Sequence, residues 1–104
     1  MTDHLKRSQK QEQAWADDIA GRTTPGSGNT WVRKNDVRND RWSIELKTTT
    51  KSQYILRSAE LVTAERQAIL DGREFAFGIE MGTRTWVVMN KVDWDRMRED
   101  AGWS

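Results

Sequence analysis

The sequence predicts a small α/β domain in which a mixed β-sheet is flanked by helices. Two patterns support this class: apolar spacings of three, four and seven residues, typical of helices, and the apolar–polar alternation typical of strands. They follow one another in the order helix, three strands, helix, two strands, helix. Because the chain has 104 residues, we expect residues 1–104 to form one domain with one core and one site.

Composition excludes several classes of protein. Lys and Arg number 17 against 16 Asp and Glu, a net charge of +1, and 36% of the residues are hydrophobic. The absence of cysteine excludes disulfide scaffolds, thiol catalysis and thiolate zinc sites, and the single histidine, His4, argues against histidine-based chemistry. No stretch has the length of a signal peptide or membrane span, so we expect a soluble, cytoplasmic protein. The six tryptophans are expected mostly to fill the core.

The first helix is predicted over residues 5–19 and carries one carboxylate on its apolar stripe. Glu12 shares this stripe with Trp15, Ala16 and Ile19. It either lies solvated at the edge of the stripe or points into a site. Residues 21–30 hold three glycines and the only proline, which predicts a loop.

Three strands are expected next, over residues 31–38, 41–47 and 53–56. A turn at Asn39-Asp40 would place Val37 opposite Trp42 and Asp36 opposite Ser43. This register gives one apolar and one polar face. The polar face carries Lys34, Asp36, Ser43, Glu45 and Lys47, and the apolar face carries Val37, Trp42, Ile44 and Leu46.

The remaining elements follow from the same patterns. A helix is predicted over residues 58–70, with Ser58 as its N-cap and Gly72 as its C-terminal stop. Strands over residues 74–81 and 84–90 form a hairpin around Gly82-Thr83. A short helix over residues 93–100 places Trp94 and Met97 on one side.

Asp36, Glu45 and Lys47 are the candidate chemical site. Two acidic side chains on neighbouring strands, with backbones about 7–8 Å apart, can converge on a hard cation such as Mg²⁺ or Mn²⁺. Lys47 lies two residues after Glu45 and therefore on the same face, where its ammonium can stabilise charge on a phosphate. The alternative is a solvated sheet face with ordinary cross-strand ion pairs, such as Lys34 with Glu45.

Charge is distributed unevenly along the chain. Residues 22–57 contain eight basic and three acidic residues, a net charge of +5, whereas the rest of the chain carries −4. A basic surface around an acidic metal site suggests a phosphodiester backbone as the ligand. The candidate DNA contacts in this segment are Arg22, Arg33, Lys34, Arg38 and Lys51.

The spacing of these residues resembles the PD-(D/E)XK nuclease superfamily, and within it the archaeal-type and phage-encoded Holliday junction resolvases. The resemblance covers about residues 8–57 and rests on four elements: Glu12, Gly26-Ser27-Gly28, Asn35-Asp36-Val37, and Ile44-Glu45-Leu46-Lys47-Thr48-Thr49. It implies a restriction-endonuclease-like fold. Asn35 departs from the family pattern, because it stands where the family has the proline that names the motif.

The resemblance also implies the roles of individual residues. Asp36 and Glu45 would be metal ligands, joined by the Leu46 backbone carbonyl, and Lys47 would be the catalytic lysine. Glu12 resembles the helix carboxylate that supports the metal. Ser27 resembles the loop serine near the scissile phosphate, although it can equally be a plain loop serine. The implied cofactor is Mg²⁺, with Mn²⁺ as a substitute.

The expected function is therefore Mg²⁺-dependent endonucleolytic cleavage of DNA, with branched or junction-containing DNA as the substrate. One such site cuts one strand, so symmetric junction cleavage implies a homodimer. Two alternatives stay open. A nickase, flap or repair endonuclease of the same superfamily would share every motif, and a non-catalytic nucleic-acid-binding module would use the basic segment alone.

Overall fold

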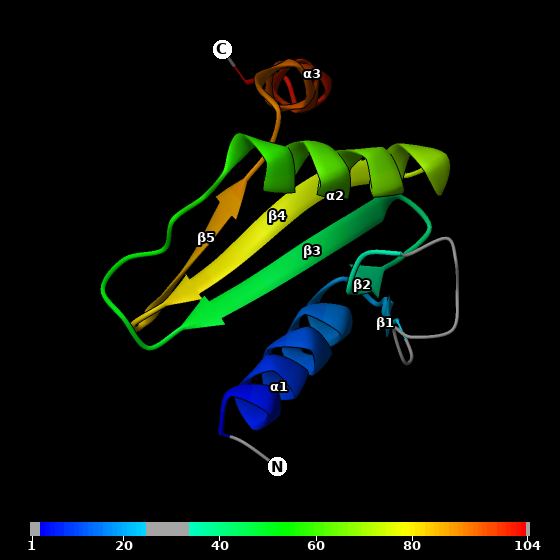
Figure 1. Ribbon diagram of the computed structural model, residues 1–104. Coiled ribbons are helices and arrows are strands. Elements are labelled where there is room, and N and C mark those ends of the chain that lie inside the picture. Colours follow the sequence, from blue (N-terminus) through cyan, green and yellow to red (C-terminus); the bar gives the residue numbers. More distant parts are fainter. Residues whose placement is uncertain (1–2, 25–33, 104) are drawn as a thin grey trace.

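The structure is a computed structural model that describes residues 3–24 and 34–103. The helices and strands have the predicted number and order, although one predicted strand is absent, one strand was not predicted, and the bounds of others differ (Figure 1). They are α1 (Asp3–Asp18), β1 (Arg22–Thr23), β2 (Val37–Arg38), β3 (Trp42–Thr49), α2 (Ser58–Leu70), β4 (Glu74–Met81), β5 (Arg84–Val88) and α3 (Lys91–Asp100).

The strands form one mixed sheet in the order β1-β2-β3-β4-β5. The β3–β4 pair is parallel and is connected through α2, and the other three pairs are antiparallel. The β2–β3 ladder joins only Val37 to Ile44 and Arg38 to Ser43. Among the described residues, the second half of β3 therefore has no strand beside it on the β2 side, which leaves an open edge. The predicted mixed α/β class, with helices flanking the sheet, is confirmed.

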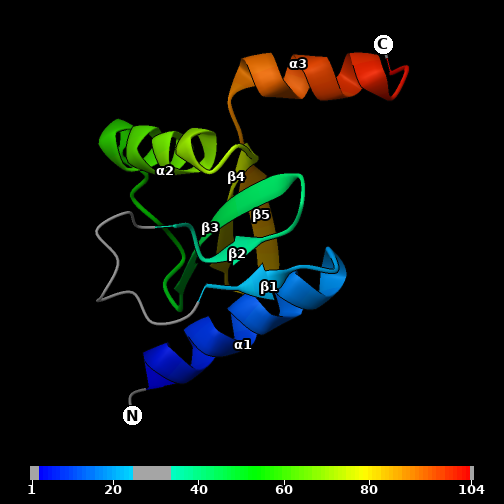
Figure 2. The ribbon, with the colours of Figure 1, turned by 90° about the vertical axis from the view of Figure 1, so that its right-hand side faces the viewer.

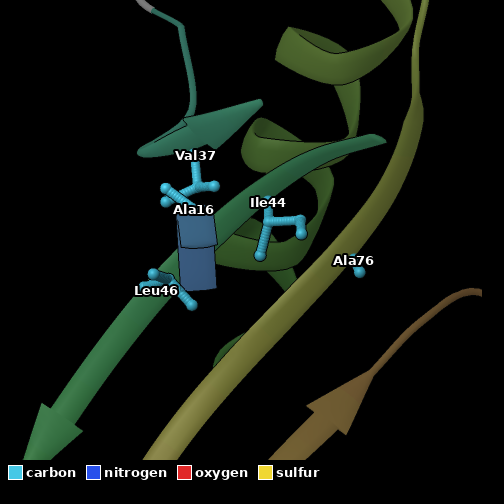
Figure 3. Packing of buried hydrophobic residues seen from close by; sticks show 5 residues of the cluster. All are labelled: Ala16, Val37, Ile44, Leu46 and Ala76. Atoms are coloured by element: carbon cyan, nitrogen blue, oxygen red, sulfur yellow. The ribbon is translucent and has the colours of Figure 1, made fainter. Parts of the chain in front are cut away.

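Helices α1 and α2 cover opposite faces of the sheet (Figures 1 and 2). On the α1 side, the alternating apolar residues of β3 form a buried cluster with Ala16, Val37 and Ala76 (Figure 3). On the α2 side, Ala64 and Ala68 pack against alternate residues of β4. This two-sided core follows from the alternation of side chains along the two central strands.

Gly78 allows the close packing of α1 on the sheet. A Cβ atom at this position would lie 2.7 Å from Leu46 Cδ2 and 2.8 Å from Trp15 Cζ2. Both distances are well below the roughly 3.5–4.0 Å of an ordinary carbon–carbon contact. The bare backbone of β4 at this glycine therefore provides the space that the Trp15 ring occupies.

The first three strands differ from the prediction. Strand β2 is short, and residues 34–36, which were predicted to be part of it, are not in a strand. Residues 53–56 are irregular, so the predicted third strand is wrong. The fifth strand of the sheet is instead β1, which lies inside the segment predicted to be a loop. It pairs with β2 through Arg22–Arg38 and Thr23–Val37.

The β2–β3 register differs from the predicted one by two residues. Asn39 Oδ1 accepts the backbone N–H groups of Arg41 (2.8 Å) and Trp42 (2.6 Å). This closes the turn around Asp40-Arg41 instead of Asn39-Asp40, and Val37 consequently faces Ile44. Because the side-chain period of a strand is two, a shift of two residues leaves the paired residues of β2 and β3 on their predicted faces. Asn35, which lies outside the strand, instead bonds Ser43 and Ala64 on the α2 side.

The later elements lie close to their predicted positions. Helix α2 and strand β4 have the predicted bounds, and α3 begins two residues earlier than expected. Ser58 is the first helical residue of α2 and not its cap, which is Arg57. The cap of α3 is Asn90, whose side chain accepts the Val92 N–H.

The five described tryptophans contribute less to the core than predicted, and Trp31 lies outside the described residues. Trp86, Trp94 and Trp103 are 51%, 42% and 58% exposed, whereas Trp15 and Trp42 are half-buried against the α1-side cluster. The reason is that β5 is an edge strand and that α3, which projects from the body of the protein, has no buried residue (Figure 2). In the part of the chain that the structure describes, no helix is long and apolar enough to span a membrane.

Candidate active site at the open edge of β3

Lys47 lies between two carboxylates. Its Nζ is 3.9 Å from Glu45 Oε2 and also 3.9 Å from Glu60 Oε2. Glu45 and Lys47 project from β3 towards α2, where Glu60 stands in the first helical turn. The Glu45 side chain is only 9% exposed, while those of Lys47 and Glu60 are 33% and 31% exposed. The ammonium thus lies at the boundary between a buried acid and solvent.

Asp36 is anchored to the strand between Glu45 and Lys47. Its Oδ2 accepts the backbone N–H of Leu46 at 2.9 Å. The N–H and C=O groups of one strand residue point to the same side of the strand. The Leu46 carbonyl therefore faces the same open edge as the Asp36 carboxylate, which lies against the strand residue between Glu45 and Lys47.

Asn35 fixes the backbone immediately before Asp36. Its side chain is fully buried, and Nδ2 donates to Ser43 Oγ at 2.9 Å and to the Ala64 carbonyl at 3.0 Å. The next residue, Asp36, is also held by its backbone, because its carbonyl accepts the Thr24 N–H at 2.8 Å. Asn35 thus ties this segment to β3 and α2, an arrangement that a proline side chain could not provide.

Glu12 approaches Asp36 from α1, the helix that covers the other face of the sheet. Partial burial raises the pKa of Glu12, and the negative charge of Asp36 raises it further. Glu12 is therefore near Asp36, but the three predicted acids do not assemble into one cage. Among residues 3–24 and 34–103, no group of three histidine, cysteine, aspartate or glutamate side chains could hold a metal ion.

The Asp36 and Glu45 carboxylates are of the chemical type that Mg²⁺ binds. This ion binds hard oxygen atoms, and it typically takes only one or two carboxylates while water and substrate phosphate complete its shell. Asp36 and Glu45 would be the carboxylates, with the Leu46 carbonyl as a third oxygen. Glu12 would then support Asp36, directly or through water.

The five predicted DNA contacts have different environments. Arg22, Lys34 and Lys51 are exposed. Arg38 is 7% exposed and its Nη1 lies 3.2 Å from Asp71 Oδ2, so it is buried in the protein and we exclude it from the DNA surface. Arg33, like the predicted site residue Ser27, lies outside the described residues.

The Arg38–Asp71 pair belongs to a structural ion cluster. Asp71, at the C-terminal end of α2, also pairs with Arg73 at 2.8 Å and with Lys34 at 3.6 Å. Burial acts to raise the pKa of Asp71, but the hydrogen bond from Arg38 and the charges of Arg73, Arg38 and Lys34 together lower it below its ordinary value. The cluster joins β2 to the end of α2 and holds one side of the site in place.

Glu60, which lies beside Lys47, was not predicted from the sequence. The Tyr54 hydroxyl donates to Glu60 Oε1 at 2.8 Å. Burial, followed by the hydrogen bond and the charge of Glu60, raises the pKa of Tyr54. Both residues line a cavity of about 410 Å³ together with Lys51 and Arg57. No local pattern marks Glu60, because only the crossover from β3 through α2 brings it to Lys47.

Comparison of the chain with models of known protein families, with curated proteins and with solved structures found no match. The resemblance to the PD-(D/E)XK superfamily therefore rests on the spacing of the motif residues in the sequence.

Proposed function

We propose that the chain is a metal-dependent endonuclease that hydrolyses DNA phosphodiester bonds, with a restriction-endonuclease-like fold of the PD-(D/E)XK type. The observation that carries the proposal is the contact between Asp36 and the Leu46 N–H at 2.9 Å. It brings one acid to the strand segment that presents the second acid, Glu45, and the amine of Lys47. Metal-dependent hydrolysis of a phosphodiester uses acids that bind the metal ion and a positive group that stabilises the charge on the phosphate.

The architecture supports the same proposal. The elements occur in the order that the resemblance implies, and the parallel β3–β4 pair is joined by α2. The candidate residues lie where β3 runs past the end of β2. Among the described residues, no further strand pairs with that edge of β3.

The chain's own residues have distinct roles in this reaction. Asp36 and Glu45 would hold the ion. Mg²⁺ bound there supplies a water molecule of lowered pKa and positive charge beside the phosphate oxygens. Lys47 directs its ammonium towards the phosphate and stabilises the negative charge that develops during in-line attack.

Branched DNA is the proposed substrate, as the resemblance to junction resolvases implies. Arg22, Lys34 and Lys51 are the exposed cations that would contact its phosphate backbone. A homodimer would supply the two sites that symmetric cleavage of a four-way junction needs. The cellular compartment proposed for this activity is the cytoplasm.

The test is incubation of the purified protein with labelled four-way junction, flap, linear duplex and single-stranded DNA, with Mg²⁺ or with EDTA. We expect cleavage that requires Mg²⁺ and is lost in Asp36→Asn and Glu45→Gln. Preference for the junction over the flap and duplex would favour the resolvase over other nucleases of the superfamily. Unchanged products in both variants would refute the site, and DNA binding without cleavage, equal in Lys47→Ala, would identify a binding module.

A further inference from the structure

We propose that the cavity at the connection between β3 and α2 is a subsite for a phosphate of the substrate strand, held by Lys51 and Arg57. The phosphate bound there neighbours the one that Lys47 contacts. This inference rests on the proposed function, because it takes DNA as the ligand. It adds Arg57 to the DNA-binding residues, and the subsite itself needs no metal ion.

The cavity borders the candidate active site. Strand β3 ends at Thr49 and α2 begins at Ser58 (Figure 1), and residues of the connecting segment line a cavity of about 410 Å³. This volume lies within the range of roughly 300–1,000 Å³ that is typical of ligand pockets. Glu60 also lines the cavity, and its Oε2 is 3.9 Å from Lys47 Nζ. A DNA strand that contacts Lys47 therefore has the cavity beside it.

Lys51 and Arg57 give the cavity positive charge. Both residues line the cavity and are exposed. Within the described part of the chain, neither side chain forms an ion pair with a carboxylate, whereas the buried Arg38 pairs with Asp71. Two unpaired cations beside one cavity suit an anion, and the guanidinium of arginine can donate two parallel hydrogen bonds to a phosphate. The charges therefore favour a phosphodiester as the ligand.

Glu60 is the acid that lines the cavity, and both of its oxygens have other partners. The Tyr54 hydroxyl donates to Oε1 at 2.8 Å, and Oε2 lies on the side of Lys47. Lys47 and the two cavity cations carry three positive charges, against two negative charges from Glu45 and Glu60, a net charge of +1. The balance of charge around the cavity thus favours a phosphate although an acid lines it.

Charge-neutral linkages in the DNA test the subsite directly. A four-way junction carries one methylphosphonate, which removes the charge of a single phosphate, at each position near the branch in turn, and binding is measured in EDTA. The branch fixes the register of the protein along the strand. We expect one linkage at which the wild type loses about tenfold in affinity, typical of a lost hydrogen bond between charged groups. At that linkage the Lys51→Gln/Arg57→Gln protein should lose nothing further. The linkage whose effect disappears in Lys47→Met should be its neighbour along the strand.

The salt dependence of binding provides a second readout with a matched control. Each of Lys51→Gln and Arg57→Gln should reduce the slope of log affinity against log salt concentration by about 1 in magnitude, because each removes an ionic contact with a phosphate. Arg66→Gln is the control: Arg66 is an exposed arginine of α2 that does not line the cavity, and its replacement should leave the slope unchanged. An equal change in all three variants would show that only diffuse surface charge acts, and would overturn the proposal.

The outcomes separate this inference from the proposed function. A methylphosphonate effect that persists unchanged in the Lys51→Gln/Arg57→Gln protein, while the wild type still cleaves DNA, would overturn the subsite alone. Interference at the expected linkage without cleavage in Mg²⁺ would support the subsite and overturn the proposed nuclease. A wild-type protein that does not bind the junction would overturn both.

Discussion

Asn35→Ala is expected to destabilise the protein, because Asn35 connects three elements next to the candidate site. Its amide donates to Ser43 Oγ on β3 and to the Ala64 carbonyl on α2, and the side chain is fully buried. The substitution removes both bonds at once. It also frees the segment that places Asp36 against Leu46.

The magnitude follows from three contributions. Each lost hydrogen bond costs about 1 kcal/mol, and the space left by the amide adds about 1 kcal/mol. Asn35 Oδ1 is buried and accepts no hydrogen bond from the described residues. Removing this unsatisfied acceptor therefore raises the free energy of unfolding by about 1 kcal/mol. The net expectation is a loss of about 2 kcal/mol in the free energy of unfolding.

Urea denaturation followed by circular dichroism measures this loss. With a slope of about 1.3 kcal/mol/M, which suits a small domain, the midpoint should fall by about 1.5 M. Ser43→Ala removes only one of the two acceptors and should cost about half as much. Asn35→Pro, which removes the same amide, should also destabilise. An Asn35→Ala midpoint within about 0.3 M of wild type would refute this account of the residue.

Two further predictions concern the core and the ion cluster. Gly78→Ala should destabilise by about 1–3 kcal/mol, because the added methyl group collides with Leu46 and Trp15; an unchanged thermal midpoint would contradict the close packing of α1. Asp71→Asn should cost about 3 kcal/mol at neutral pH, because it leaves the buried Arg38 unpaired. Since the pKa of Asp71 is lowered in the folded state, its contribution is present above the unfolded pKa of about 3.9 and is lost as pH falls through the folded value. Urea titrations of wild type and Asp71→Asn should therefore converge at acid pH, and a difference that stays constant would refute the assignment.

Much of the fold could be predicted because its signals are local. Helix α2 and strand β4 have the bounds that their apolar patterns predict. The faces of β3 were also predicted, although the β2–β3 register was not. The turn depends on the Asn39 side chain accepting two backbone N–H groups, and the dipeptide preference used for the prediction places the turn one residue too early. Strand β1 is two residues long, too short for any alternation to reveal it.

The candidate site was predictable only along the strand that carries it. The placement of Glu45 and Lys47 on one face follows from alternation within β3. The surroundings of the other site residues depend on contacts with α2 and its C-terminal end. Asp71 pairs with Arg38, the Ala64 carbonyl accepts from Asn35, and Glu60 lies beside Lys47. These partners are distant in sequence, so neither composition nor spacing could show that one predicted DNA contact is internal or that a third acid borders the lysine.

The central claim is that the carboxylates of Asp36 and Glu45 share a divalent ion at the open edge of β3. The most direct test is a crystal structure with Mn²⁺, whose anomalous scattering locates the ion independently of the protein atoms. We expect a single strong peak about 2.2 Å from one oxygen each of Asp36, Glu45 and the Leu46 carbonyl, a typical metal–oxygen distance. A peak elsewhere, or none at a saturating Mn²⁺ concentration, would contradict it.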